Sequence, residues 1–250
     1  MTFSKHLIQK LDTTDSTNNA AFRMLEQENP SEGTVVVSKF QTAGKGQGQC
    51  TWSSEAGQNL TFSLILKPFF LEPSRQFFLN QAVALGVRDG LCELSKGVPF
   101  CIKWPNDIYF EKKKIAGILI ENRVMGSIYD TAVAGVGINI NQKEFNPELP
   151  NPTSLHLITK NQTDLDDALA VVVEQIMHYY NMLKSGKHNL LYNNYLLHLL
   201  GLNQWNSFED SSGAFSGKIV GTDTYGQLLV EKKNAAVEAY EVKEIKLLLA

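Results

Sequence analysis

The spacing of apolar residues changes its period near residue 100, and this change constrains the fold more than any other feature of the sequence. From Pro73 to about Lys96, apolar residues recur at the spacing of an amphipathic helix, and Pro73 suits its first turn. Three runs rich in β-branched and aromatic side chains follow, at 100–110, 114–124 and 128–140. Short links that carry charged residues or glycine predict that these runs form an antiparallel meander.

Shorter patterns complete the larger part of the chain. Three segments are typical of strands, at 7–10, 34–38 and 59–66. A capped helix is expected after Asp15-Ser16-Thr17. The apolar stripes of 164–183 and 188–200 predict two more helices, which should cover one face of the sheet.

After Gly201, short runs separated by turn signals predict a small β-barrel. A barrel of roughly 45 residues is near the lower limit for independent stability, so we expect it to pack on the larger domain. We therefore divide the chain into a larger domain, residues 1–203, and a carboxy-terminal barrel, residues 204–250.

The charge balance argues against nucleic acid as the main partner. The 23 basic and 26 acidic residues give a net charge of −3, which leaves no sequence-wide positive field for phosphate backbones or anionic lipid. No apolar run approaches the roughly 20 residues that cross a bilayer, and residues 1–6 lack the apolar region of a signal peptide. Cys50, Cys92 and Cys101 form no Cys-x-x-Cys pair, and the histidines lack zinc-ligand spacing. We expect a cytoplasmic protein with reduced thiols and no membrane partner.

The stretch from Gln41 to Trp52, here called the glycine loop, joins two predicted strands and carries glycine at positions 44, 46 and 48. Backbone N–H groups freed by such glycines can turn inward to cradle an anion, and Lys45 adds a positive charge beside them. The spacing is not that of a Walker phosphate loop. By composition alone, a flexible linker is the alternative interpretation.

A second stretch, Lys103-Trp104-Pro105-Asn106-Asp107, interrupts a strand at its proline, which predicts a sheet edge or a bulge. Asp107 would then lie at an irregular point where a carboxylate can hold a magnesium ion or orient a lysine. Lys114 lies between a charged turn and the apolar run 115–120, which could bring its ammonium toward a site. A solvated lysine in the turn is the alternative.

Two further motifs are ambiguous by themselves. The run Gly135-Val136-Gly137-Ile138-Asn139 puts two glycines in a strand, which either the close approach of a ligand or a β-bulge explains. The run Asp15-Ser16-Thr17-Asn18 suits a helix cap or a binding site, and its spacing favours the cap.

Taken together and in this order, the stretches 15–18, 41–52, 103–107, 114–119 and 135–139 resemble those of the biotin–protein ligases, also called biotin–[acetyl-CoA-carboxylase] synthetases. The run 217–231 is similar to the family's carboxy-terminal SH3-like barrel, so the resemblance covers essentially the whole chain. It implies an α+β fold, in which helices cover a mixed β-sheet as in class II aminoacyl-tRNA synthetases, followed by the small SH3-like β-barrel.

The resemblance implies an ATP-dependent ligase that forms biotinyl-5′-AMP and transfers biotin to a lysine of a biotin carboxyl carrier domain. It implies ATP and biotin as substrates with Mg²⁺, and no tightly bound prosthetic group. By similarity, catalysis falls to Lys114, Lys45 and Asp107, and Asp107 is also the metal candidate. The implied biotin contacts are Ser16, Thr17, Asn18, Gln41, Lys45, Gly46, Gln47, Lys114, Gly117, Gly135 and Gly137. The implied ATP and adenylate contacts are Gly44, Lys45, Gly46, Trp52, Lys103, Asn106, Lys114 and Asn139.

The sequence also departs from the family pattern. Many members place arginines through the glycine loop, whereas Lys45, Gln47 and Cys50 stand here. Because the run 15–18 begins so early, we expect no winged-helix domain and no DNA partner. A homodimer could form through an exposed strand. Two alternatives remain: a lipoate or octanoate ligase of the same fold, which 103–107 and the barrel disfavour, and a non-catalytic biotin-binding adapter.

Overall fold

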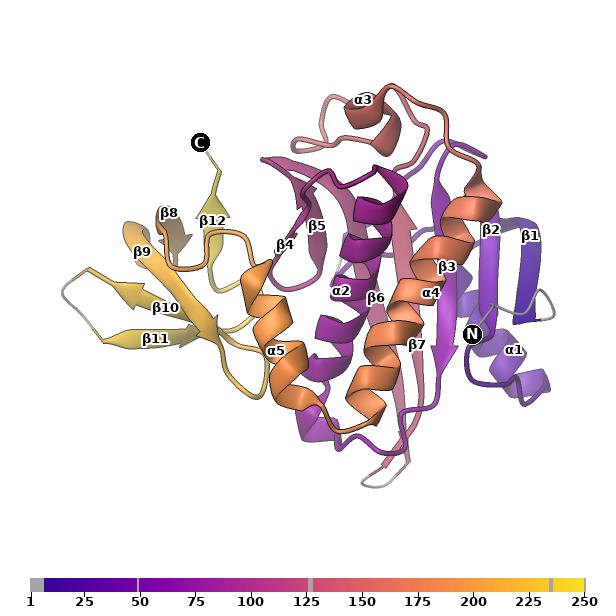
Figure 1. Ribbon diagram of the computed structural model, residues 1–250, viewed down its shortest axis with the longest axis horizontal. Helices are drawn as coiled ribbons and strands as arrows, with labels where there is room; N and C mark the ends of the chain where they lie inside the picture. Colours follow the sequence, from indigo (N-terminus) through magenta and orange to yellow (C-terminus); the bar gives the residue numbers. More distant parts are fainter. Residues whose placement is uncertain (1–6, 49, 126–127, 234–235, 250) are drawn as a thin grey trace.

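The computed structural model describes residues 7–48, 50–125, 128–233 and 236–249. Three parts of the sequence predictions lie outside the described residues: residues 1–6, which were expected to carry no signal peptide, Gln49 of the glycine loop, and the expected turn residue Gly126. The described part contains a seven-stranded sheet, helices on both of its faces and a separate five-stranded sheet (Figure 1). None of the helices described is both long enough and apolar enough to span a membrane.

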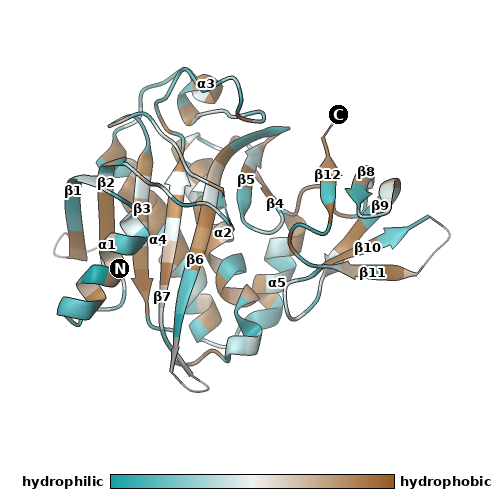
Figure 2. Cartoon of the chain, turned by 180° about the vertical axis from the view of Figure 1, so that it is seen from behind, coloured by the Kyte–Doolittle hydropathy of each residue, from teal (hydrophilic) through white to brown (hydrophobic). Residues whose placement is uncertain are grey.

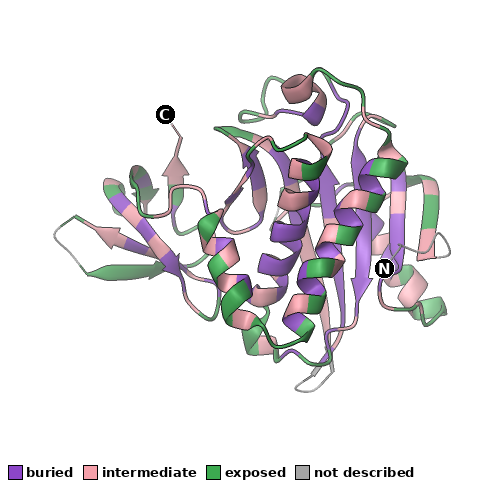
Figure 3. Cartoon of the chain, in the orientation of Figure 1, coloured by how far each residue is buried: buried purple, intermediate pink, exposed green. Residues whose placement is uncertain are grey.

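The larger sheet combines parallel and antiparallel strands. Its order is β1 (Ile8–Thr14), β2 (Val35–Gln41), β3 (Leu60–Leu66), β7 (Ile128–Ile138), β6 (Lys113–Met125), β5 (Asp107–Phe110) and β4 (Cys101–Lys103). β1 pairs with β2 in parallel, and the other neighbouring pairs are antiparallel. The predicted α+β fold with a mixed sheet is confirmed. Burial falls from the central strands toward β1 at the edge (Figure 3), and the hydropathy falls in the same direction (Figure 2).

Alternate residues of the strands face helices on opposite sides of the sheet. As expected, α4 (Leu165–Lys184) and α5 (His188–Leu197) lie on the same side of the sheet as α2 (Phe77–Leu94) (Figure 1). The opposite side is covered by α1 (Thr17–Gln27), whose Ala21 packs in a separate cluster with Val36, Ile65 and Val133. Each side of the sheet therefore has its own apolar layer.

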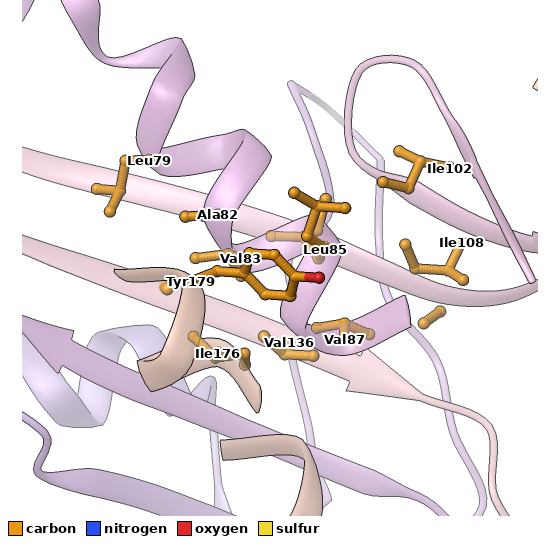
Figure 4. Packing of buried hydrophobic residues seen from close by; sticks show 14 of the residues in the cluster. Leu79, Ala82, Val83, Leu85, Val87, Ile102, Ile108, Val136, Ile176 and Tyr179 are labelled. Atoms are coloured by element: carbon orange, nitrogen blue, oxygen red, sulfur yellow. The ribbon is translucent and has the colours of Figure 1, made fainter. Parts of the chain in front are cut away.

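The contact between α2 and α4 is unusually close because glycine lies at the crossing. A Cβ built on Gly86 would be only 2.3 Å from the Cα of Ile176. Around this point the apolar side chains of both helices pack against residues of the sheet (Figure 4). The larger domain thus has a dense core between this face of the sheet and the two helices.

Several element boundaries differ from the sequence predictions. The run 100–110 forms two strands, β4 and β5, because the chain reverses at 104–106, where the Trp104–Pro105 peptide bond is cis. The helix expected from Pro73 begins as the 3-10 helix η2 (Pro73–Arg75), and the helix expected to reach Leu200 ends at Leu197. The short helix α3 (Leu155–Thr159), capped by the side chain of Ser154, was not predicted.

The smaller sheet is antiparallel, with the order β11 (Val237–Tyr240), β10 (Leu228–Lys232), β9 (Gly213–Thr222), β8 (Trp205–Asp210) and β12 (Lys246–Leu248). This arrangement fits the predicted SH3-like barrel, although β8 and β12 lie outside the segments that the sequence pattern indicated. The indole Nε1 of Trp104 donates a 2.8 Å hydrogen bond to the carbonyl of Gly226, and Tyr192 Oη donates at 2.9 Å to the carbonyl of Thr222. The barrel therefore packs on the larger domain. The boundary between residues 203 and 204 stays a prediction.

Candidate active site

A cavity of about 240 Å³ lies where the glycine loop, the start of α1 and strands β5, β6 and β7 meet. Most of the residues proposed from the sequence line it: Ser16, Thr17, Asn18, Gln41, Lys45, Gly46, Gln47, Trp52, Asn106, Asp107, Lys114, Gly117, Gly135 and Gly137. The fold thus brings together motifs that lie far apart in the sequence, from Ser16 to Gly137.

The floor of the cavity is a buried polar cluster at the start of α1. Gln41 Oε1 accepts hydrogen bonds from the backbone N of Thr17 at 2.8 Å and from Thr17 Oγ1 at 3.1 Å. Ser63, which the sequence analysis did not single out, lies with its Oγ 2.8 Å from Thr17 Oγ1 and 2.6 Å from Asn18 Oδ1. Because Gln41 Oε1 is occupied, its amide NH₂ is the group left to donate to a ligand.

Ser16 occupies the N-cap position of α1, yet its side chain makes no capping hydrogen bond. Ser16 is only 2% exposed and lines the cavity, so its hydroxyl lies at the cavity and not in bulk solvent. The run Asp15-Ser16-Thr17-Asn18 thus begins α1 with Ser16 at the N-cap, as its spacing favours, but the Ser16 hydroxyl does not cap the helix. The carboxylate of Asp15 instead pairs with Arg23 at 2.7 Å, which holds the pKa of Asp15 well below its usual range.

The glycines of β6 and β7 make room for two side chains. A Cβ on Gly135 would lie 2.3 Å from Asn18 Oδ1, and a Cβ on Gly137 would lie 2.3 Å from Trp52 Cε2. Gly117 is directly opposite Gly137 in the sheet, and its Cβ would approach Trp52 Cζ3 at 3.2 Å. The register with β3 and β6 is continuous through 135–137, so the β-bulge alternative is wrong.

The glycine loop is folded back on itself as a hairpin. Lys45 and Thr51 form an antiparallel bridge, and the backbone N of Gly46 donates to the carbonyl of Cys50 at 2.8 Å. This arrangement places the ring of Trp52 over the glycines of β6 and β7 as a lid on the cavity. The indole Nε1 of Trp52 is buried and has no partner among the described protein groups.

Lys114 lies at the cavity and not in a solvated turn. Its Nζ is 2.7 Å from Asp107 Oδ1 and 5.9 Å from the centroid of the Trp52 ring. Its backbone N donates at 2.8 Å to the carbonyl of Asn151, and its carbonyl accepts from the backbone N of Thr153 at 2.9 Å. The segment 151–153, just before α3, thus holds the backbone of Lys114 in place.

Three residues proposed to contact ATP or the adenylate do not line the cavity. Gly44 packs against the backbone of Trp52, with a built Cβ 2.3 Å from the Trp52 carbonyl oxygen. The Lys103 Nζ lies 5.5 Å from the Tyr109 ring centroid, where burial, with a smaller effect of neighbouring Lys114, lowers its pKa. Asn139 Nδ2 donates at 2.9 Å to the carbonyl of Thr153, so this amide supports the segment that holds Lys114.

Several lining residues were missed as site candidates, namely Cys50, Thr51, Ile118, Leu119, Val136 and Lys243. The first five lie inside or beside the motifs already noted, so their positions could have been anticipated. Lys243 comes from the barrel, and no local pattern points to it. Among the described residues, no group of three or more His, Cys, Asp or Glu side chains is arranged to hold a metal ion.

Comparison with known proteins places the chain in a family. Residues 11–139 match the family model described as the biotin/lipoate A/B protein ligase family. The chain is 34% identical over 248 residues to the bifunctional ligase/repressor BirA of Bacillus subtilis, covering 94% of this chain and 72% of that one. It is 29% identical to the biotin–protein ligase of Schizosaccharomyces pombe over 85% of this chain and 36% of that one.

A solved structure supports the same assignment. The biotin protein ligase from Aquifex aeolicus, in complex with biotin and ATP, matches with a TM-score of 0.80 and 29% identity, covering 96% of this chain and 97% of that one. The match extends through the barrel as well as the larger domain. The chain therefore belongs to the biotin/lipoate A/B protein ligase family.

Proposed function

We propose that the protein is an ATP-dependent biotin–protein ligase, which forms biotinyl-5′-AMP and transfers the biotinyl group to a lysine of a biotin carboxyl carrier domain. One observation carries this proposal. The Lys114 ammonium and the partly buried polar pair Thr17 and Gln41 line the same small cavity, under the Trp52 lid. An acid with a polar ring at its far end fits between these groups.

The cavity divides into two parts by chemistry. The ureido group of biotin, a fixed set of carbonyl and N–H groups, suits Ser16, Thr17, Asn18 and Gln41 at the floor. The small surface of Gly117, Gly135 and Gly137 admits the bicyclic ring and chain. The adenosine lies toward Trp52 and Asn106, with Lys45, Gly46 and Gln47 of the glycine loop across it.

In the first reaction a biotin carboxylate oxygen forms a bond to the α-phosphorus of ATP, and the bond from that phosphorus to the bridging oxygen breaks, releasing diphosphate. Two anions must approach each other, so a fixed cation at the reacting phosphate stabilises the transition state. Lys114 is that cation, because its backbone is anchored and Asp107 orients its ammonium. In the second reaction the carrier lysine, as a neutral amine, attacks the anhydride carbonyl, and AMP leaves.

The residues at the cavity also fit a magnesium ion. Mg²⁺ is usually bound by one or two carboxylates together with substrate phosphates, and it neutralises phosphate charge. Asp107, whose Oδ1 pairs with Lys114, is the carboxylate that lines this cavity, and it would hold the ion together with Asn106 beside it. Held there, the ion would offset the negative charge of the phosphates as the biotin carboxylate approaches.

The exchange of labelled diphosphate into ATP tests the function. We expect exchange that depends on biotin and not on lipoate, and biotin transfer to a purified carrier domain. Exchange supported by lipoate or octanoate alone would assign the protein to the lipoate branch of the family. Biotin binding without exchange would make it an adapter.

The remaining expectations concern location and partners. The described cysteines are free, which suits the reducing cytoplasm where we place the enzyme.

With a net charge of −3 we propose no sequence-specific DNA binding by this chain, and a gel shift at physiological salt on a biotin operator tests this. The exposed edge strand β1 is the surface through which a homodimer would form, which sedimentation of the protein with and without biotinyl-AMP measures.

A further inference from the structure

Three lysines line the cavity, and they differ in their partners. Lys114 pairs with Asp107 at 2.7 Å, and Lys45 lies 3.5 Å from Glu121 Oε1 while donating to Asn19 at 2.6 Å. Lys243, in the turn between β11 and β12, has no described carboxylate within 4.0 Å of its ammonium. Of these three lysines, it is therefore the one whose charge no described carboxylate offsets.

The carboxylates nearest to Lys243 in sequence are used elsewhere. Glu244 Oε2 accepts from the backbone N of Glu241 at 2.7 Å, and Glu241 Oε1 accepts from Gln227 Nε2 at 2.8 Å. Both acids therefore hold the turn together instead of neutralising the lysine. The turn itself places Lys243 in the left-handed region, with φ of 76°.

The ammonium of Lys243 lies next to Gly48 of the glycine loop. A Cβ built on Gly48 would lie 2.4 Å from Lys243 Nζ and 3.0 Å from its Cε, so the lysine fills the space that a side chain would need. Within 41–52 the sequence holds one basic residue, Lys45, which already has partners. The barrel thus adds a cation to the loop that closes the cavity.

We propose that Lys243 binds the phosphate of the acyl-adenylate, so that the barrel supplies the cation that retains the intermediate under the glycine loop. This inference rests on the proposed function. The adenylate carries one negative charge on the phosphate that joins the acyl group to adenosine, and an ammonium–phosphate contact is a strong, charge-assisted hydrogen bond. Free biotin carries no such group and does not need Lys243.

The test compares Lys243→Ala and Lys243→Arg with a matched barrel control, Lys233→Ala. Lys233 is exposed beside the β10–β11 turn and lines none of the cavity. Ala, Arg and Lys bear similar backbone strain at position 243. Lys243→Arg keeps a cation on a long stem, and Lys243→Ala removes both the stem and the cation. The ligand is an unreactive analogue in which biotinol is esterified to AMP, and calorimetry measures its dissociation constant and that of free biotin.

We expect Lys243→Ala to bind the analogue about tenfold more weakly, with biotin affinity unchanged. Lys243→Arg and Lys233→Ala should bind both ligands like the wild type. Biotinyl-AMP preformed on the enzyme should dissociate about tenfold faster from Lys243→Ala. Equal affinity of wild type and Lys243→Ala for the analogue overturns the proposal, and an equal loss for biotin assigns Lys243 a structural role.

Failure of the proposed function has a different signature. If the wild type binds the analogue but catalyses no biotin-dependent exchange, the ligase activity is rejected, and the comparison of variants still decides the role of Lys243. If the wild type does not bind the analogue at all, both proposals are rejected.

Discussion

Gly117, Gly135 and Gly137 shape the site by leaving space that Asn18 and Trp52 occupy. Each of these side chains comes from a segment far away in sequence, so a single glycine fixes the position of a distant group. Lys114, in contrast to the glycines, acts through its side chain. Its backbone is held by neighbouring residues, and its ammonium, paired with Asp107, lies at the cavity where it can act on a ligand. Substitutions at these positions should therefore change function more than stability.

Lys114→Ala should reduce biotin-dependent diphosphate exchange by at least about 100-fold, since removing one transition-state stabilising group has that effect. The melting temperature should change little, because the partly exposed pair with Asp107 contributes little stability. Exchange kinetics and thermal denaturation measure the two effects. The exposed neighbour Lys113 offers a control: Lys113→Ala should retain full activity, and near-normal exchange in Lys114→Ala would remove Lys114 from the mechanism.

The two glycines of β7 should separate the two substrates. Gly137→Ala narrows the surface that admits biotin and pushes a methyl group into Trp52, so it should raise the KM for ATP as well as for biotin. Gly135→Ala pushes into Asn18 and should raise the KM for biotin alone. Both residues lie in regular strand, so neither variant should unfold. Steady-state kinetics with each substrate varied in turn tests this, and identical changes in both variants contradict the division of the cavity.

Among the elements, the packing of α2 on α4 depends on close contact at two glycines. Gly86 faces the backbone of Ile176, whereas Gly90 faces Val172, with a built Cβ 2.9 Å from both Cα and Cγ2. The sequence pattern predicted both helices but not their crossing, because helical spacing identifies the buried face and not its partner. Two of the elements that the sequence pattern missed, α3 and β12, are only 5 and 3 residues long, which is too short for a period to emerge.

Gly86→Ala should destabilise the protein by about 3 kcal/mol, since backbone atoms must separate to admit the methyl group. Gly90→Ala should be close to neutral, because the smaller clash is offset by the roughly 1 kcal/mol gain in helix propensity. Urea denaturation of both variants gives the comparison. If Gly86→Ala were as stable as the wild type, the close crossing of the helices would be incorrect.

Glu32, just before β2, accepts hydrogen bonds from Tyr180 and Lys184 of α4. We expect this link to make the stability of the protein depend on pH. Burial acts to raise the pKa of Glu32, but hydrogen bonds from Lys184 and Tyr180 outweigh burial and hold the pKa below the usual 4.5. The stabilisation is therefore present above pH 4.5 and is lost as the pH falls through the lowered pKa. Glu32→Gln should cost about 1 kcal/mol at pH 7 and less at pH 3, by urea denaturation. A difference that does not shrink in acid contradicts this ionic link.

At the scale of the whole molecule, the barrel is part of the main core and of the cavity. Phe208, Ile219, Leu228 and Val230 belong to the same apolar cluster as α2 and α5, and Lys243 reaches the glycine loop. The motifs in the larger domain made most of the site predictable, because each carries its own local pattern. Lys243 could not be found in this way, since its role depends on how two domains pack.

Trp104 tests this packing. Trp104→Phe keeps the apolar contact but leaves the Gly226 carbonyl without its indole donor, so we expect a loss of about 1 kcal/mol and faster hydrogen exchange in the barrel. Trp205→Phe is the control, because Trp205 is half exposed on the barrel surface. Unchanged exchange in Trp104→Phe would mean that this hydrogen bond does not hold the barrel.

The cavity draws its lining from Ser16 through Lys243, and this span has a consequence during translation. Domains generally fold as units during synthesis, and the amino-terminal domain folds first. The lining of the cavity is therefore complete only after Lys243 has been synthesised and has left the exit tunnel. A nascent or prematurely terminated chain that lacks Lys243 would release its reactive intermediate readily, so the order of synthesis delays secure activation of biotin until the enzyme is whole.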